Sequence, residues 1–221
     1  MTATSRDHSV HVTDERINTI SHLVGACFAV LGAALLITQA AADGDPWKIV
    51  GVSIYSASLI TLFVCSTLHH GLDRGPLVND ILRTLDYTSV FFLIAGTVTP
   101  IVLVLVRDPF GWAVLGAVWF VAIAGIVGRS VWRDVPKWVT NTLFIVLGWM
   151  PSVLVFSGVD LPVGALALMA AGGLFYSVGF VIFIIEKPNP IPGVFGFHEI
   201  WHLLVLIASA LQYVMIYVYV L

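Results

Sequence analysis

Residues 19–42 read TISHLVGACFAVLGAALLITQAAA, an apolar stretch without a single Asp, Glu, Lys or Arg. A helix needs about 20 mainly apolar residues to cross the hydrocarbon core of a bilayer. The apolar residues of this stretch do not alternate with polar ones, as they would in a strand of a membrane β-barrel. The stretch is therefore predicted to be a transmembrane helix.

Comparable stretches fill the rest of the chain, which has 221 residues, 59% of them hydrophobic and only 10% charged. A soluble domain carries about 25% charged residues. Six further spans are expected: 47–70, 81–106, a fourth ending near 132, a fifth ending near 156, a sixth ending near 185, and 197–221. The sequence thus predicts an all-α integral membrane protein, a bundle of seven transmembrane helices over residues 19–221, preceded by a short cytoplasmic tail over residues 1–18.

Two local patterns refine this expectation. In the first span, Gly25, Ala29 and Ala33 recur every four residues. Small residues at this spacing let helix backbones approach closely in a membrane. Pro151 falls inside the fifth span and is expected to kink it.

The positions of Lys and Arg predict the orientation. Eight of them lie on the side of the N-terminus: Arg6, Arg16, Arg74, Arg83, Arg129, Arg133, Lys137 and Lys187. Only Lys48 and Arg107 lie on the other side. Because cytoplasmic loops carry an excess of basic residues, the N-terminus is expected in the cytoplasm and the C-terminus outside, in a multi-pass protein of the plasma (inner) membrane. Membrane lipid is the expected partner, and the lack of a basic run argues against nucleic acid.

The few ionisable residues inside the spans fall at one depth, on the cytoplasmic side. They are His22, His69, His70, Asp86, His198, Glu199 and His202. Ionisable groups inside a membrane are costly and commonly mark functional sites. A single histidine of this kind can equally be a hydrogen-bonded packing residue, so only the group as a whole indicates a functional site.

His198 and His202 are four residues apart, and helix residues at this spacing share one face. Two imidazoles so placed can hold one metal ion, and His70 is the natural third ligand. Three protein ligands with an open fourth position are typical of catalytic zinc. A proton relay or transport pathway is the alternative for this cluster.

Two more residues are candidates for chemistry. Asp86 is expected to take a proton from a metal-activated water or to orient it, with an ion pair to Arg83 as the alternative. Ser66 lies one helical turn before His70 and could hydrogen-bond the water or Asp86. Its alternative is a bond to its own helix backbone.

Glu199 completes the pattern H-E-x-x-H, in which the Glu of soluble metalloproteases is the general base. An intramembrane metalloprotease is therefore one hypothesis, and a helix-start charge is the other interpretation of Glu199. Glu15, Asn18 and His22 are spaced to line one helix face and are expected to support the site. An ordinary amphipathic segment is their alternative.

Taken in order, these motifs resemble the hemolysin III family, the bacterial branch of the progestin and adipoQ receptor superfamily. The matching residues are Glu15-Arg16-Ile17-Asn18, Ser21-His22, Ser66-Thr67-Leu68-His69-His70, Asp86-Tyr87, and His198 with His202. The resemblance implies zinc bound by His70, His198 and His202 near the cytoplasmic face, with Ser66 and Asp86 beside the metal water. His69 departs from the family, which more usually has an aromatic residue there.

Related alkaline ceramidases are similar in metal site and hydrolyse a lipid amide. The resemblance therefore implies a zinc-dependent hydrolase that attacks a lipid amide or ester with an activated water. The alternatives are a membrane sensor or receptor with structural zinc that acts in membrane homeostasis, a pore-forming cytolysin, and the intramembrane metalloprotease.

Overall fold

A computed structural model describes residues 15–132 and 135–221 of the chain. Its elements are α1 (Arg16–Asp43), α2 (Pro46–Gly71), α3 (Pro76–Pro100), a π-helix (Ile101–Leu105), α4 (Pro109–Val131), α5 (Lys137–Trp149), a 3₁₀-helix (Met150–Phe156), α6 (Val163–Ile185) and α7 (Phe197–Tyr219). Within the described residues, seven helical segments are long and apolar enough to cross a membrane. The predicted all-α bundle of seven transmembrane helices is confirmed.

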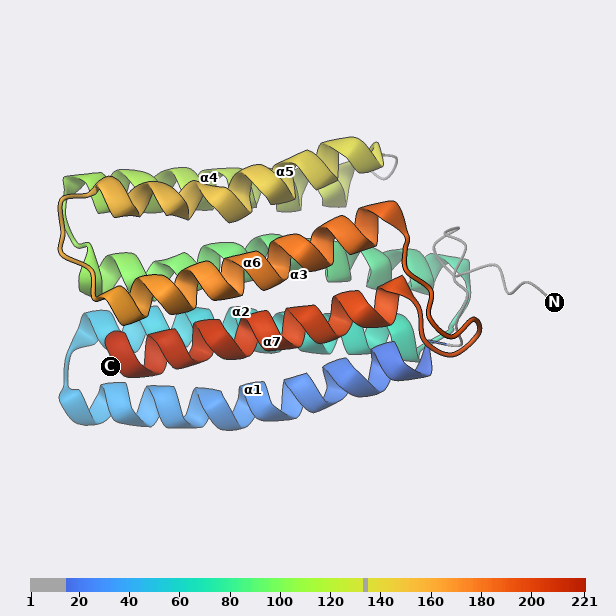
Figure 1. Ribbon diagram of the computed structural model, residues 1–221, viewed down its shortest axis with the longest axis horizontal. Coiled ribbons are helices and arrows are strands. Elements are labelled where there is room, and N and C mark those ends of the chain that lie inside the picture. The colour runs from blue at the N-terminus through green and yellow to red at the C-terminus, as the bar shows by residue number, and fades with distance from the viewer. Residues whose placement is uncertain (1–14, 133–134) are drawn as a thin grey trace.

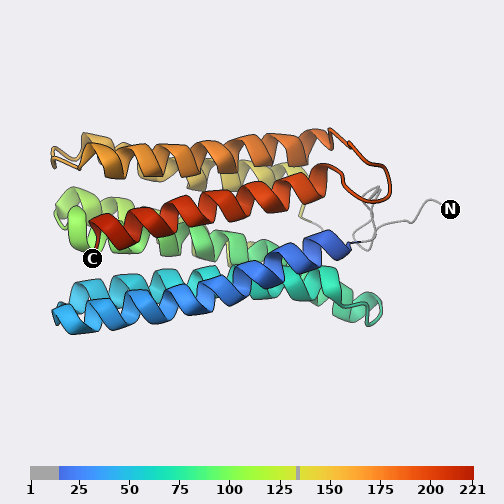
Figure 2. The same cartoon turned by 60° about the horizontal axis from the view of Figure 1, so that its bottom comes forward.

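The helices lie side by side along one common direction (Figures 1 and 2). They alternate up and down, so that α1, α3, α5 and α7 begin at the end of the bundle where α2, α4 and α6 finish (Figure 1). The tightest pairs are α1 with α2, α2 with α3, and α6 with α7, and α7 also packs on α1. This arrangement brings the start of α7 next to the start of α1 and the end of α2.

The small-residue face of α1 is one reason for this packing. Gly25, Ala29 and Ala33 are all buried, as the spacing predicts. A Cβ atom added at Gly25 would lie only 2.7 Å from Leu206 in α7 and 2.8 Å from Phe63 in α2. The absence of a side chain at Gly25 therefore lets α1 approach both neighbours that carry candidate ligands.

Several helix boundaries differ from the sequence prediction. Helix α1 already begins at Arg16, inside the stretch assigned to the tail. Helix α3 begins at Pro76 rather than at residue 81, because proline suits the first helical position, where no backbone N–H is needed. The fifth span changes from α-helix to 3₁₀-helix at Met150, next to Pro151. Arg6 and Arg133, which entered the charge count, lie outside the described residues, and the orientation itself stays a prediction.

Candidate metal centre

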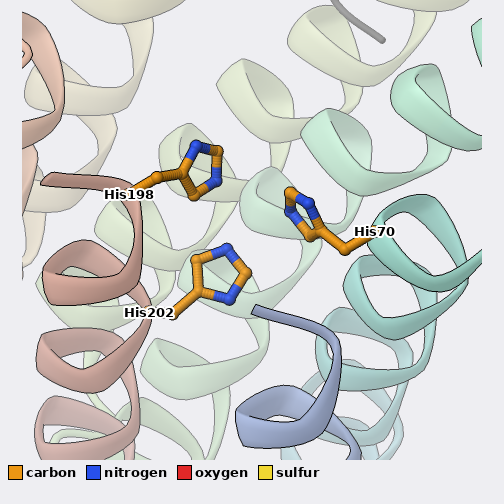
Figure 3. Close-up of side chains that lie close together, drawn as sticks. All are labelled: His70, His198 and His202. Carbon is orange, nitrogen blue, oxygen red and sulfur yellow. The ribbon is translucent and has the colours of Figure 1, made fainter. Parts of the chain in front are cut away.

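Three histidines from two helices converge near one end of the bundle. His70 lies in the last turn of α2, and His198 and His202 lie in the first two turns of α7. One ligand nitrogen from each ring lies within 4.8 Å of the other two. The ring of His70 extends from α2 towards the rings of His198 and His202 on α7 (Figure 3), and the centroids of the three rings are 4.7 to 4.9 Å apart. This group could hold a metal ion.

The chemistry of these donors fits a transition metal. All three histidines are buried, with exposed fractions of 5% for His70, 8% for His198 and 2% for His202. The Nδ1 atom of His202 has no hydrogen-bond partner among the described residues. A buried polar atom of this kind calls for a partner, which a metal ion or an ordered water would supply. Imidazole suits zinc, copper, iron and nickel, so the ligand set by itself does not identify the metal.

Glu15 holds the ring of His70 from the side of α1. Its Oε2 atom lies 2.8 Å from His70 Nδ1. Burial alone would raise the pKa of the Glu15 carboxyl, but the hydrogen bond with His70 and the charges of His70 and His198 together keep that pKa well below its ordinary value. The carboxylate therefore stays ionised, and its contact with Nδ1 fixes the orientation of the His70 ring. Such carboxylate–histidine pairs orient metal ligands in many proteins.

Asn18 links this pair to α7. Its Nδ2 atom donates to Glu15 Oε2 and to Glu199 Oε1, both at 2.9 Å. The other oxygen of Glu199, Oε2, accepts from the backbone N–H of Gly196 at 2.8 Å and caps the start of α7. One amide thus joins the helix that carries His198 and His202 to the carboxylate that holds His70.

This network refines the predicted roles at the N-terminus of α1. Glu15 contacts His70 and Asn18 contacts Glu199, while the supporting role of these two residues stays a prediction. Sequence reasoning missed the bond between Asn18 and Glu199, which are 181 residues apart. The only signal for it was that both residues lie at the same predicted depth.

His22 supports the centre in a different way. Its ring stacks on His202, with centroids 3.8 Å apart and an angle of 23° between the planes, and its edge meets Phe63. His22 is 3% exposed, and neither of its ring nitrogens has a hydrogen-bond partner in the described part of the chain. Because the two rings are stacked, His22 restricts the orientation of the candidate ligand His202.

Asp86 and His69 form a second group around His70. One ligand atom of each of these three residues lies within 4.8 Å of the other two. Asp86 is half-buried. Arg83, the alternative ion-pair partner of Asp86, forms an ion pair of 2.7 Å with Asp80. A pairing of Arg83 with Asp86 would compete with this ion pair.

Ser66 is buried one turn before His70 on α2. On the same helix, the hydroxyls of Ser58 and Thr67 donate to backbone carbonyl oxygens one turn earlier. This is the kind of bond named above as the alternative for Ser66. Asp86 thus lies near His69 and His70, and Ser66 lies one turn before His70 on the same helix.

Comparison with known proteins identifies the family. Residues 10–213 match the family described as Haemolysin-III related. The chain belongs to this family. Its haemolysin relatives include Hemolysin-3 of Bacillus cereus, 35% identical over 211 residues, which cover 95% of this chain and 93% of the relative. The Hemolysin-3 homolog of Bacillus subtilis (strain 168) is 32% identical, with 91% and 92% covered.

A more distant relative is a human protein. Monocyte to macrophage differentiation factor of Homo sapiens is 27% identical, and the match covers 91% of this chain and 82% of the relative. Family membership, together with the seven apolar helices, establishes a multi-pass integral membrane protein.

Proposed function

We propose that this protein is a zinc-dependent hydrolase that cleaves an amide or ester bond of a membrane lipid, with its metal centre near the cytoplasmic side of the plasma membrane. The observation that carries the proposal is the convergence of His70, His198 and His202. Three protein ligands leave the fourth position of a tetrahedral ion open for water or substrate, as in catalytic zinc sites.

The roles of the residues follow from their positions. His70, His198 and His202 hold the ion, and Glu15 and His22 orient two of these rings. A bound zinc ion supplies Lewis-acid activation of a water and of the carbonyl under attack.

Asp86 would act as the proton carrier. Its carboxylate lies within 4.8 Å of a ring nitrogen of His70, close enough to accept a proton from the attacking water. The water oxygen bonds to the carbonyl carbon, the C–N or C–O bond breaks, and Asp86 returns the proton to the leaving amine or alcohol. Ser66, one turn from His70, would orient the water through its hydroxyl.

The surroundings of the centre favour a lipid substrate. Phe183 meets His198 edge to face at 5.6 Å, and Trp201 and Phe197 pack beside the same ring system. These aromatic side chains give this side of the centre an apolar character, which would suit a lipid substrate.

The contacts of Glu199 weigh against the metalloprotease hypothesis. Its two carboxylate oxygens accept from Asn18 and from the N–H of Gly196, and the residue is 1% exposed. A general base must reach the attacking water, whereas Glu199 is engaged in holding α7 to α1. We therefore assign the proton transfer to Asp86.

The test is fatty-acid release from a lipid amide of the ceramide type in reconstituted liposomes. Asp86→Asn should lower the rate by about 100-fold or more, the typical value of a general base, while retaining the metal. Asp160→Asn changes an exposed carboxylate in the loop before α6 and is the control that should hydrolyse normally. Unchanged hydrolysis in Asp86→Asn or in His70→Ala would contradict the proposal. Equal dye leakage with wild type and His70→Ala, without hydrolysis, would favour a pore.

A further inference from the structure

A buried tyrosine near the middle of α2 carries a hydroxyl that the described part of the chain does not satisfy. Tyr55 is 1% exposed, and its hydroxyl has no hydrogen-bond partner among the described residues. The backbone carbonyl oxygen of the same residue does have one, because Ser58 donates to it at 2.7 Å. A buried hydroxyl without a partner is destabilising, so a protein that retains one calls for an explanation.

Tyr55 lies at a depth where other polar side chains meet inside the bundle. Helices α1 and α2 run in opposite directions from the turn at Gly44, and Gly32 lies about as far before this turn as Tyr55 lies after it. Tyr213 of α7 donates to the backbone carbonyl oxygen of Gly32 at 3.1 Å. Tyr55 also interacts electrostatically with Tyr213 and with Tyr176 of α6. The three phenols therefore share one region of the interior.

The neighbouring polar groups of α6 and α7 are paired with one another. The hydroxyls of Tyr176 and Ser209 are 2.8 Å apart. Gln212 donates through Nε2 to the backbone carbonyl oxygen of Met169 at 3.2 Å. These bonds join α6 to α7, and neither includes Tyr55. The hydroxyl of Tyr55 is therefore not explained by the packing of these helices.

The chemistry of this region limits what can bind there. A tyrosine hydroxyl donates one hydrogen bond and accepts another. The side chains that meet at this level are phenols, a serine hydroxyl and an amide, all of which are neutral. A charged ligand in such an interior needs an opposite charge to offset its desolvation. A neutral group that both donates and accepts, such as a hydroxyl, is the chemistry that fits.

We propose that the hydroxyl of Tyr55 forms a binding position for a neutral hydroxyl group inside the bundle. Water and a hydroxylated lipid chain are the two sources of such a group in a membrane protein. Tyr55 precedes His70 on α2 by roughly 22 Å of helix axis, at 1.5 Å per residue. The position is therefore separate from the metal centre, and it does not depend on the proposed hydrolase activity.

The first test removes the hydroxyl and keeps the ring. Tyr55→Phe should lower the Tm in detergent by about 2–4 °C, as the loss of one hydrogen bond does in a protein of this size. A hydroxyl without a partner would give the opposite result, because its removal relieves a desolvation penalty. Tyr217→Phe, at a position in α7 that is 49% exposed, is the matched control and should leave the Tm unchanged. A Tm that rises or stays the same in Tyr55→Phe would overturn the proposal.

A second measurement separates the two sources. Purified wild type and Tyr55→Phe are titrated with methyl stearate and with the same ester carrying a mid-chain hydroxyl. A larger rise in Tm with the hydroxylated ester, in wild type alone, supports a lipid source. Equal responses of the two proteins, together with the lower Tm of Tyr55→Phe, support a bound water.

A structure that resolves ordered waters provides the direct check. Density from a water or a lipid chain should lie about 3 Å from the phenol oxygen of Tyr55. No density at this distance, or a protein group bonded to the hydroxyl in its place, would overturn the proposal.

Discussion

Helices α2 and α6 are similarly apolar, yet they have opposite positions in the bundle. In α2, 50% of an 18-residue stretch is buried, against 11% of the corresponding stretch in α6. Helix α2 packs on α1 and α3, whereas α6 packs mainly on α7 and exposes residues such as Val163 and Leu174. Apolar composition thus shows that a helix lies in the membrane, but not whether it faces protein or lipid.

The residues of the candidate site also lie on the more buried helices and not on α6. Every predicted site residue belongs to α1, α2, α3 or α7, or directly precedes α1. Polar groups inside a bilayer need partners, and only helices with protein on several sides can provide them. The distribution of polar residues therefore distinguishes the inner helices from the lipid-facing ones better than hydropathy does.

The largest difference in stability between the helices of the site and the lipid-facing α6 is expected for substitutions at Glu199 in α7 and at Leu174 in α6. Glu199→Ala removes two hydrogen bonds: Asn18 Nδ2 keeps only its bond to Glu15, and the backbone N–H of Gly196 loses its acceptor. It should lower the free energy of unfolding by about 3 kcal/mol. Leu174→Ala changes a side chain that is 61% exposed and should alter stability by less than about 0.5 kcal/mol. Thermal unfolding in detergent measures both effects. Equal Tm values for Glu199→Ala and Leu174→Ala would contradict the difference between the site helices and α6.

Two glycines test the packing directly. A Cβ atom at Gly51 in α2 would lie 2.8 Å from the Cα atom of Pro100, a backbone atom that cannot turn away. Gly51→Ala should therefore cost about 1–3 kcal/mol, as overpacking does. At Gly173 in α6, a Cβ atom meets nothing within 4 Å. Gly173→Ala should be neutral or slightly stabilising, and a Tm loss as large as that of Gly51→Ala would contradict the lipid-facing position of this surface.

A smaller effect is expected for His22, and it concerns metal affinity more than stability. His22→Ala removes the ring that stacks on His202. Zinc affinity should fall by about 10- to 100-fold, as for other changes behind a metal ligand. His22→Phe keeps an aromatic ring in the same place and should retain most of the affinity. The two variants are compared by zinc titration, and equal affinities for His22→Ala and wild type would rule out a role of His22 in orienting His202.

The sequence alone predicts much of this arrangement. Long apolar stretches locate the seven spans, and the i, i+4 spacing of His198 and His202 places them on one face. Helix ends are harder to predict, because Pro76 can be either a loop residue or the first residue of a helix, and packing selects between the two.

The contacts between helices lie beyond such patterns. The bonds of Asn18 with Glu199 and of Glu15 with His70 depend on how far each helix is shifted and rotated against its neighbours. Those shifts result from the packing of many side chains, including the close approach at Gly25. Depth in the membrane predicts which residues can meet, but not which of them bond.

The most direct test of the account is the metal content of the purified protein, measured for wild type and for His198→Ala. About one zinc ion per wild-type chain is expected, with the bound ion lost in His198→Ala, since a buried tetrahedral site needs all three imidazoles. His22→Phe serves as a folded control that should keep the ion. Wild type without bound metal under metal-replete conditions, or equal zinc in His198→Ala, would contradict the three-histidine centre.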